Sequence, residues 1–137
     1  MTDPHQAASL DAATLDFAHS MFELAREGGE RVLAEHLDAG LPVNLTNDKG
    51  DTLLILAAYH QHPATVRVLL ARGADPSRVN DRGQTALAAA VFRRSAEIVT
   101  ALLATGADPG AGSPSARETA VFFELTDMSD LLAQDDS

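Results

Sequence analysis

The segment DKGDTLLILAAYHQHPATVRVLLARGADP, residues 48–76, recurs one period later as DRGQTALAAAVFRRSAEIVTALLATGADP, residues 81–109. The offset between the two copies is 33 residues, and it superimposes Gly50 on Gly83. Both copies also end in the same four residues, Gly-Ala-Asp-Pro. A fixed period of this length is typical of a repeat array, in which each unit buries its apolar face against its neighbours.

Each copy begins with the signals for a turn and a buried helix. Gly50 and Gly83 lie among polar residues, where a tight turn with positive φ is expected. Thr52 and Thr85 each precede an apolar run, and their hydroxyl groups can cap the first turn of a helix. The run at residues 53–58 is apolar on all sides, which suits a helix packed between two neighbours.

A second short helix follows in each copy. A break at His62-Pro63 in the first copy, and at Arg94-Ser95 in the second, separates it from the first helix. Apolar residues then fall on one helical face, and a glycine directly after them predicts the end of the helix. These positions are Val66, Leu69, Leu70 and Gly73 in the first copy, and Val99, Leu102, Leu103 and Gly106 in the second.

Together these residues resemble the ankyrin-repeat consensus. The resemblance rests on Gly50-Asp51-Thr52, Ala57-Ala58 and Gly73-Ala74-Asp75, with the apolar positions between them. It implies an all-α fold, an ankyrin-repeat solenoid of about four helix–turn–helix repeats, with two full central repeats and two atypical capping repeats. Apolar packing is expected where the family has a polar brace. Its usual Thr-Pro-Leu-His reads Thr52-Leu53-Leu54-Ile55, Thr85-Ala86-Leu87-Ala88 and Thr119-Ala120-Val121-Phe122 here.

The period divides the chain into one domain, residues 11–133, between two tails. Residues 1–10 are polar and show no period, so we expect a flexible N-terminal tail there. Residues 134–137 are expected to form an acidic C-terminal tail. The expected repeats are residues 11–46, 47–79, 80–112 and 113–133.

The two outer repeats carry weaker forms of the pattern. In the fourth, an offset of 34 aligns Thr119 with Thr85 and predicts a first helix that runs through Leu125. Its second helix is then expected to begin at Leu131 and to stop almost at once. In the first repeat, one buried helical face is predicted from the spacing of Leu15, Ala18, Phe22 and Ala25.

Composition narrows the class of protein. The chain has no cysteine, so neither a disulfide nor a cysteine-ligated metal is expected. It has no basic-then-apolar leader and no apolar run of transmembrane length. Alanine is abundant and nine of the ten basic residues are arginine, a usage typical of GC-rich bacterial genomes. We expect a monomeric, cytoplasmic bacterial protein with no cofactor and no membrane association.

The net charge of −10 is unevenly distributed. Residues 1–46 carry eight acids and two bases, and residues 113–137 carry six and one, whereas residues 47–112 carry six acids and seven bases. Nucleic-acid binding needs clustered basic residues that displace counterions, so no nucleic-acid partner is expected. The acidic ends motivate one alternative function, that of an inhibitor or immunity-type protein that blocks a basic enzyme.

The resemblance also implies a concave binding surface, built from turn tips and the ends of the first helices. Tyr59 and Phe92 occupy the same repeat position on it, and interface anchors are enriched in aromatic residues and arginine. Two interpretations are open: the rings anchor a partner, or they cover the gap between neighbouring helices. Carried over by position, the expected partner-binding residues are Asp48, Lys49, Asp51, Tyr59, His60, Arg72, Asp81, Arg82, Gln84, Phe92 and Arg93.

The basic residues of the central repeats also allow two interpretations. They could dock an acidic segment or a phosphate, or they could form a solvated face whose ion pairs contribute only about 0–1 kcal/mol each. The set consists of Lys49, Arg72, Arg78, Arg82, Arg93 and Arg94.

No motif for catalysis or metal binding stands out. There is no phosphate-binding loop and no nucleophile elbow. His60 and His62 are two residues apart, which points them to different faces of a helix, so no metal site is expected. We therefore predict a non-enzymatic protein–protein interaction module that binds a partner protein through its concave face, with the acidic inhibitor as the alternative.

Overall fold

A computed structural model describes the backbone of residues 4–135 and the side chains of residues 13–133. Residues 4–135 contain eight helices and no strand. No helix in this part of the chain combines the length and the apolar character that a membrane span requires. The helices are α1 (Pro4–Glu27), α2 (Glu30–Asp38), α3 (Leu53–Tyr59), α4 (Pro63–Ala71), α5 (Ala86–Phe92), α6 (Ala96–Ala104), α7 (Ala116–Phe122) and α8 (Thr126–Asp135).

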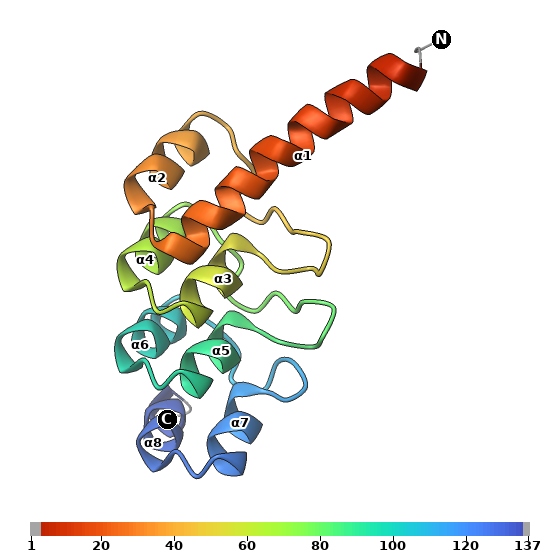
Figure 1. Cartoon of the computed structure of the whole chain (residues 1–137). Helices are drawn as coiled ribbons and strands as arrows, with labels where there is room; N and C mark the ends of the chain where they lie inside the picture. Colours follow the sequence, from red (N-terminus) through yellow and green to blue (C-terminus); the bar gives the residue numbers. More distant parts are fainter. Residues whose placement is uncertain (1–3, 136–137) are drawn as a thin grey trace.

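The helices stack as four pairs in two layers (Figure 1). The first helix of each pair packs on the first helices before and after it, in the order α1, α3, α5, α7. The second helices form the other layer in the order α2, α4, α6, α8. Long loops precede α3, α5 and α7 and project side by side from the first layer. The all-α solenoid of four helical repeats that the sequence predicts is confirmed.

Threonine caps set the start of the two central first helices, as the sequence predicts. The Oγ1 atom of Thr52 accepts a hydrogen bond from the Ile55 N–H at 3.0 Å, and Thr85 caps Ala88 in the same way, also at 3.0 Å. Both threonines are buried, so each cap satisfies a backbone donor that water could not reach. The cap therefore fixes the residue at which the buried first helix of each central repeat begins.

The core lies between the two layers, and its residues come from every repeat. In α4, Val66 and Leu69 are fully buried, whereas Leu70, which the sequence places on the same face, is only partly buried. The same holds in α6, where Leu102 is fully buried and Leu103 is not. The second leucine of each pair therefore lies at the edge of the core.

The predicted register of the fourth repeat is wrong. Its first helix, α7, begins after Ser115, whose Oγ accepts a hydrogen bond from the Glu118 N–H at 3.1 Å while the Glu118 carboxylate accepts one from the Ser115 N–H at 2.9 Å. This reciprocal capping box places the repeat 30 residues, not 34, after Thr85. Thr119 lies inside α7, and its hydroxyl donates to the Ser115 carbonyl at 2.8 Å. The shift lengthens the second helix, because α8 already begins at Thr126.

The N-terminal prediction also differs from the structure. Helix α1 already begins at Pro4, so residues 4–10 are helical rather than a loose tail; residues 1–3 lie outside the described part. Proline is favoured in the first turn of a helix, and no glycine interrupts residues 4–27. The early part of α1 projects beyond the stack (Figure 1). Leu15 is accordingly exposed, and the buried face of α1 consists of Met21, Phe22 and Ala25.

At the other end, the expected acidic tail over residues 134–137 is partly helical. Helix α8 continues to Asp135, and residues 136–137 lie outside the described part of the chain. The buried contacts of α8 come from Met128 and Leu132, which are one helical turn apart and face the core. These two residues attach the last helix to the stack, so the second helix of the fourth repeat is a full helix rather than a single turn.

The leucine pair of α4 gives a test of this packing. We predict that Leu69→Ala lowers the free energy of unfolding by about 2–5 kcal/mol, because it leaves a cavity in a fully buried site. Leu70→Ala removes the same atoms from a partly buried site and should cost clearly less. Urea denaturation of the two variants and the wild type measures both values. Equal losses would contradict this assignment of the core edge.

Candidate functional site

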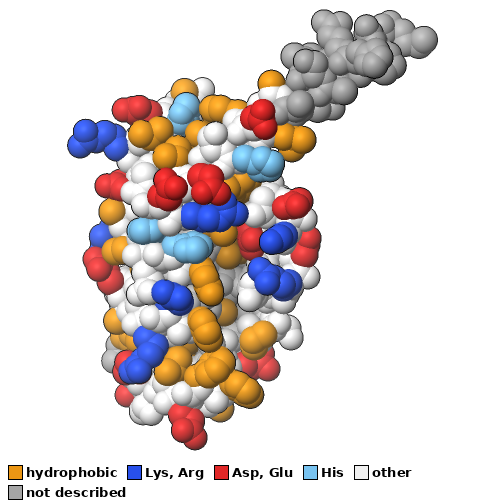
Figure 2. All heavy atoms as spheres, in the orientation of Figure 1, with side chains coloured by type: hydrophobic (Ala, Val, Ile, Leu, Met, Phe, Trp, Pro, Cys, Tyr) orange, Lys and Arg blue, Asp and Glu red, His pale blue; other side chains and the backbone are white. Residues whose placement is uncertain are grey.

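A groove runs between the projecting loops and the exposed ends of the first helices, with a volume of about 690 Å³. Figure 2 shows this face: hydrophobic side chains run down it as a column, with lysine and arginine side chains on both flanks. Most of the residues predicted to bind a partner line the groove. They are Asp48, Lys49, Asp51, Tyr59, His60, Arg82, Gln84 and Phe92.

Two asparagines shape the loop tips at residues 47–51 and 80–84. The Oδ1 atom of Asn47 accepts hydrogen bonds from the backbone N–H groups of Lys49 and Asp51, both at 2.9 Å. Asn80 does the same with the backbone N–H groups two and four residues further on, also at 2.9 Å. Each asparagine thus holds its tip in a tight turn, and the turns expose Lys49 and Arg82 at the rim of the groove.

Neighbouring loops are bound to each other as well as to their own helices. The Asp81 N–H donates to the Lys49 carbonyl at 3.0 Å, and the Asn80 side chain donates to the Asp51 carboxylate at 2.7 Å. Gly50 makes this approach possible: its φ is +76°, and an added Cβ would lie 2.9 Å from the Asp81 nitrogen. The loops therefore form one continuous wall of the groove.

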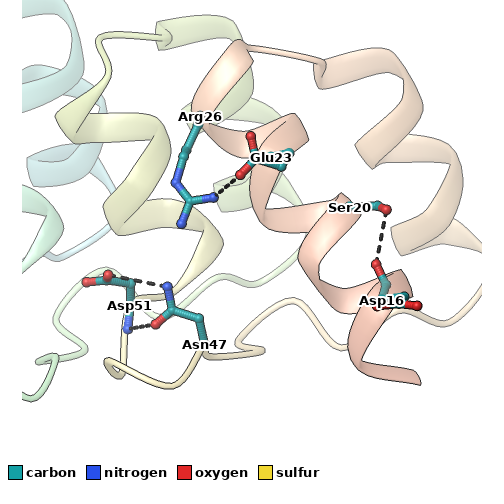
Figure 3. A network of polar contacts seen from close by, with 6 residues as sticks. All are labelled: Asp16, Ser20, Glu23, Arg26, Asn47 and Asp51. Carbon is teal, nitrogen blue, oxygen red and sulfur yellow. Dashed lines mark hydrogen bonds and ion pairs between the residues drawn. The ribbon is translucent and has the colours of Figure 1, made fainter. Parts of the chain in front are cut away.

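Asp51 is a structural residue of this wall. Its side chain is buried, and its carboxylate accepts hydrogen bonds from Asn47 at 3.4 Å and from Asn80 at 2.7 Å. Figure 3 shows it beside Asn47, across from the Arg26–Glu23 pair of α1. The contacts of Asp51 are thus made within the protein, and its part in partner binding remains a prediction.

Aromatic rings form the floor of the groove. Tyr59 and Phe92 end α3 and α5, and 41% and 46% of their surfaces remain exposed. The Phe92 ring lies edge-on to Phe123, with ring centroids 5.3 Å apart, and Phe123 is 49% exposed. We call Tyr59, Phe92 and Phe123 the aromatic column. Because nearly half of each ring faces solvent, none of the three is a core residue.

Phe123 is among the groove residues that the sequence analysis missed. The wrong register of the fourth repeat placed it inside a helix, whereas it is the C-cap of α7, close to the position of Tyr59 and Phe92 in their repeats. The Ser115-x-x-Glu118 capping box was the signal that could have corrected this register. Others come from α1, which was treated only as an end cap. They are His19, Phe22, Glu23 and Arg26.

The Tyr59 ring is contacted by an arginine and a histidine. The Arg93 guanidinium lies over its ring, 5.3 Å from the centroid, and the His60 ring meets it edge-on at 5.2 Å. Burial lowers the pKa of His60, and the positive charge of the nearby Arg26 and Arg93 lowers it further, while Glu23 opposes them. His60 therefore favours its neutral form at neutral pH, and the charge at this end of the groove comes from the arginines.

Three predicted site residues do not line the groove. Arg72 caps the C-terminus of α4 in the second layer, where its guanidinium pairs with Asp38 of the preceding repeat at 2.9 and 3.2 Å. This hydrogen bond lowers the pKa of Asp38. Arg72 lies at the end of α4, directly before Gly73, and its side chain contacts α2 rather than the loops. Asp81 is exposed on its loop but does not line the groove. Arg93 is not a lining residue either, although it contacts Tyr59.

No metal centre is formed in the described part of the chain. No three histidine, aspartate or glutamate side chains there lie close enough together to hold an ion. His62 instead hydrogen-bonds to the Arg26 carbonyl at 2.7 Å, which ties the start of α4 to the end of α1. This histidine braces two neighbouring repeats.

Known proteins show the same pattern of repeats. The family described as ankyrin repeats (three copies) matches residues 21–112. A Pseudomonas aeruginosa protein named as an ankyrin repeat protein is 50% identical over 68 residues. The matched stretch is 50% of this chain and 39% of the relative, so the chain spans about two fifths of the length of the curated relative it matches.

The contact between loops can be tested through its asparagines. We predict that Asn80→Ala lowers the free energy of unfolding by about 1–3 kcal/mol, because it leaves the buried Asp51 carboxylate without its shortest hydrogen bond. Asn47→Ala is the matched control: that asparagine also holds its own turn, but the hydrogen bonds found for it stay within one loop. Thermal and urea unfolding compare the two. A cost for Asn47→Ala equal to that for Asn80→Ala would argue against stacking between the loops.

The environment of His60 predicts its titration. We expect a pKa below the ordinary value of 6.5 in the folded protein and a return to that value in urea. Since the unfolded chain then binds the proton more readily, His60 should reduce the stability of the fold as the pH falls through 6.5. NMR titration of the ring protons measures the pKa. Arg26→Gln should raise it partway, because burial remains; a wild-type midpoint at or above 6.5 would contradict the prediction.

Proposed function

The chain belongs to the ankyrin-repeat family, whose members are generally protein–protein interaction modules, and we propose that it is a non-enzymatic adaptor that binds a partner protein in the groove between its loops and first helices. The partner is a protein segment or loop that enters the groove and covers the aromatic column. Function in this fold is carried by surface residues rather than by the repeat consensus, so the proposal rests on the groove and its side chains.

The exposed aromatic column is the observation that carries the proposal. Three aromatic residues, Tyr59, Phe92 and Phe123, line the same groove and keep 41–49% of their surfaces exposed. Exposed apolar surface that is gathered in one place and bordered by polar residues marks interaction sites on soluble proteins. Aromatic residues are also the most frequent anchors of binding energy, because they bury a large area and lose little side-chain entropy.

The rigidity of the groove supports the same proposal. Both of its walls are held by contacts between repeats: hydrogen bonds join the loops at residues 49–51 and 80–81, and helix packing holds α3 between α1 and α5. A partner that binds such a preformed site does not have to order it first, which lowers the free-energy cost of association. The geometry therefore favours recognition of a short segment by a preformed surface.

The chemistry of the groove supports binding rather than catalysis. The carboxylates of Glu23 and Asp51 are already engaged, the first with Arg26 at 2.5 Å and the second with Asn47 and Asn80. A general base needs a carboxylate or imidazole that is directed at a reacting group. The carboxylates of Glu23 and Asp51 are instead directed at side chains of the protein itself. Members of the family are typically non-enzymatic, in keeping with this view.

The inhibitor hypothesis places the contact elsewhere. Its motivation is the acidic ends of the chain, where acidic residues are exposed on α1, α2 and α8. A basic enzyme would be steered to those surfaces by long-range charge, and its association rate would fall steeply as salt rises. A groove-bound partner would instead depend on the aromatic column. The two hypotheses thus differ in which residues the partner requires.

Affinity capture from bacterial lysate tests the proposal. We predict that wild-type protein retains a partner that Tyr59→Ala/Phe92→Ala loses, while both proteins keep nearly the same melting temperature, because the two rings are about half exposed. The matched control is Val32→Ala/Val79→Ala, which removes exposed apolar side chains outside the groove and should retain the partner. A partner that all three proteins retain would argue against the groove and favour the inhibitor hypothesis.

A further inference from the structure

Three cations border the aromatic column and form no ion pair with any described side chain. Lys49 and Arg82 stand at the tips of neighbouring loops on one side, and Arg93 lies over Tyr59 on the other. The ion pairs among the described side chains involve other arginines, namely Arg26, Arg67, Arg72 and Arg94. The Gln61 amide oxygen can accept hydrogen bonds from Arg93 at 2.7 and 3.1 Å, but this contact leaves the positive charge uncompensated.

Two of the three carboxylates that line the same groove are already paired or hydrogen-bonded within the protein. Glu23 pairs with Arg26, and the Asp51 carboxylate is buried and hydrogen-bonded to two asparagines. Asp48 is the remaining carboxylate among the lining residues, and it is exposed at the outer tip of its loop. Asp81 is also exposed, beside Arg82, but does not line the groove. Outside the ion pairs of the described side chains and the buried Asp51, the lining residues thus carry Lys49 and Arg82 against Asp48, an excess of positive charge on a chain whose net charge is −10. Such a local reversal of sign selects partners by charge as well as by shape.

The two ends of the groove differ in character. The end near α1 carries His19, Glu23 and Arg26, whereas the end at α7 is apolar. Phe122 and Val121 are 78% and 72% exposed there, and the Phe122 ring packs edge-on against Phe123 with centroids 4.8 Å apart. In the repeat before, the residue equivalent to Val121 is Val91, which is fully buried. Val121 and Phe122 line an adjacent hollow together with Arg117 and Glu118, and Phe123 is common to this hollow and the groove. The apolar surface of α7 thus continues the aromatic column.

We propose that the occupant of the groove is an acidic-apolar protein segment, in which aspartate or glutamate residues lie beside Lys49, Arg82 and Arg93 and a bulky apolar residue lies over Phe122 and Phe123. The inference rests on the proposed function, since it names the chemistry of the partner at the same groove. Charge complementarity sets the position of the acidic residues, and the apolar end at α7 sets the direction of the segment. A basic segment would meet the three uncompensated cations and be repelled.

Selection from a display library of random dodecapeptides tests this assignment. The wild-type protein is the bait, and the affinities of the enriched peptides are then measured for purified variants by fluorescence anisotropy. We expect the enriched peptides to combine aspartate or glutamate with a bulky apolar residue. Lys49→Glu/Arg82→Glu should weaken their binding by about tenfold or more, and added salt should weaken wild-type binding.

The matched control is Arg31→Glu/Arg78→Glu; Arg78 belongs to the basic set of the central repeats but does not line the groove. The control reverses two exposed cations outside the groove, so the net charge changes equally and binding should change by no more than about twofold. Circular dichroism establishes that both variants are folded. Equal losses in the two charge-reversed variants would show that only the overall charge matters and would overturn the inference.

The Tyr59→Ala/Phe92→Ala variant separates this inference from the proposed function. Peptides that require the two rings but show no acidic residues, or that are basic, would overturn the inference and leave the groove as the binding site. A selection that yields no peptide dependent on the rings would overturn the inference as well. The proposed function fails separately, if the partner captured from lysate is retained by the same variant.

Discussion

Burial of one helix between two others is the interaction on which the rest of this structure depends. A helix such as α3, with six consecutive buried residues from Leu53 to Ala58, cannot shield its surface with its own repeat and needs α1 on one side and α5 on the other. Alanine at residues 57, 58, 86, 88 and 90 allows these helices to approach closely. The requirement propagates along the stack, so each repeat is stable only in the presence of its neighbours.

The groove follows from that stacking. Once the first helices are aligned, the loops that precede them are aligned too, and each loop can donate a backbone hydrogen bond to the one before it, as Asp81 does to Lys49 and Ser113 to Gly83. The last residues of the two central first helices, α3 and α5, then line the same groove. Tyr59 and Phe92 are neighbours in space for this reason, although 33 residues separate them. The proposed binding surface thus relies on exposed residues at the ends of helices that are themselves held by the core.

In the described part of the chain, the outer first helices, α1 and α7, each pack on one neighbouring first helix instead of two, and more of their apolar surface is exposed. Helix α1 packs on α3 only through its last turns, so its earlier part is free to project and exposes Leu15 and Phe17. Helix α7 packs on α5, and within residues 4–135 no further first helix covers its other side, so Val121 and Phe122 are left at the surface. The two ends differ in charge as well as in packing, so one end of the groove is polar and the other is apolar.

Much of the fold was predictable from the sequence alone, because the features that define it depend on residues close together in the chain. The repeat period, the Thr52 and Thr85 caps, the glycine turns and the buried faces of α4 and α6 each depend on a few neighbouring residues, so their sequence signals are complete. Most of the predicted groove residues followed from the same period. The fourth repeat was misplaced because two caps competed for the same segment: Thr119 continued the period, whereas Ser115 with Glu118 satisfies more backbone groups.

The sequence by itself determined the all-α solenoid, its central register and the equivalent repeat positions of Tyr59 and Phe92, because each of these depends on residues repeated at a constant spacing. Only the tertiary structure decided which charges remain available. Arg72 and Arg82 each precede a glycine, yet Arg72 pairs with Asp38 in the second layer, while Arg82 lies at a loop tip and forms no ion pair with the described side chains. Asp48 and Asp51 are three residues apart, yet one is exposed and the other is held by two asparagines. These contacts join residues about 30 positions apart in the sequence, such as Arg72 with Asp38 and Asn80 with Asp51. Such residues come within contact distance only when the repeats have stacked.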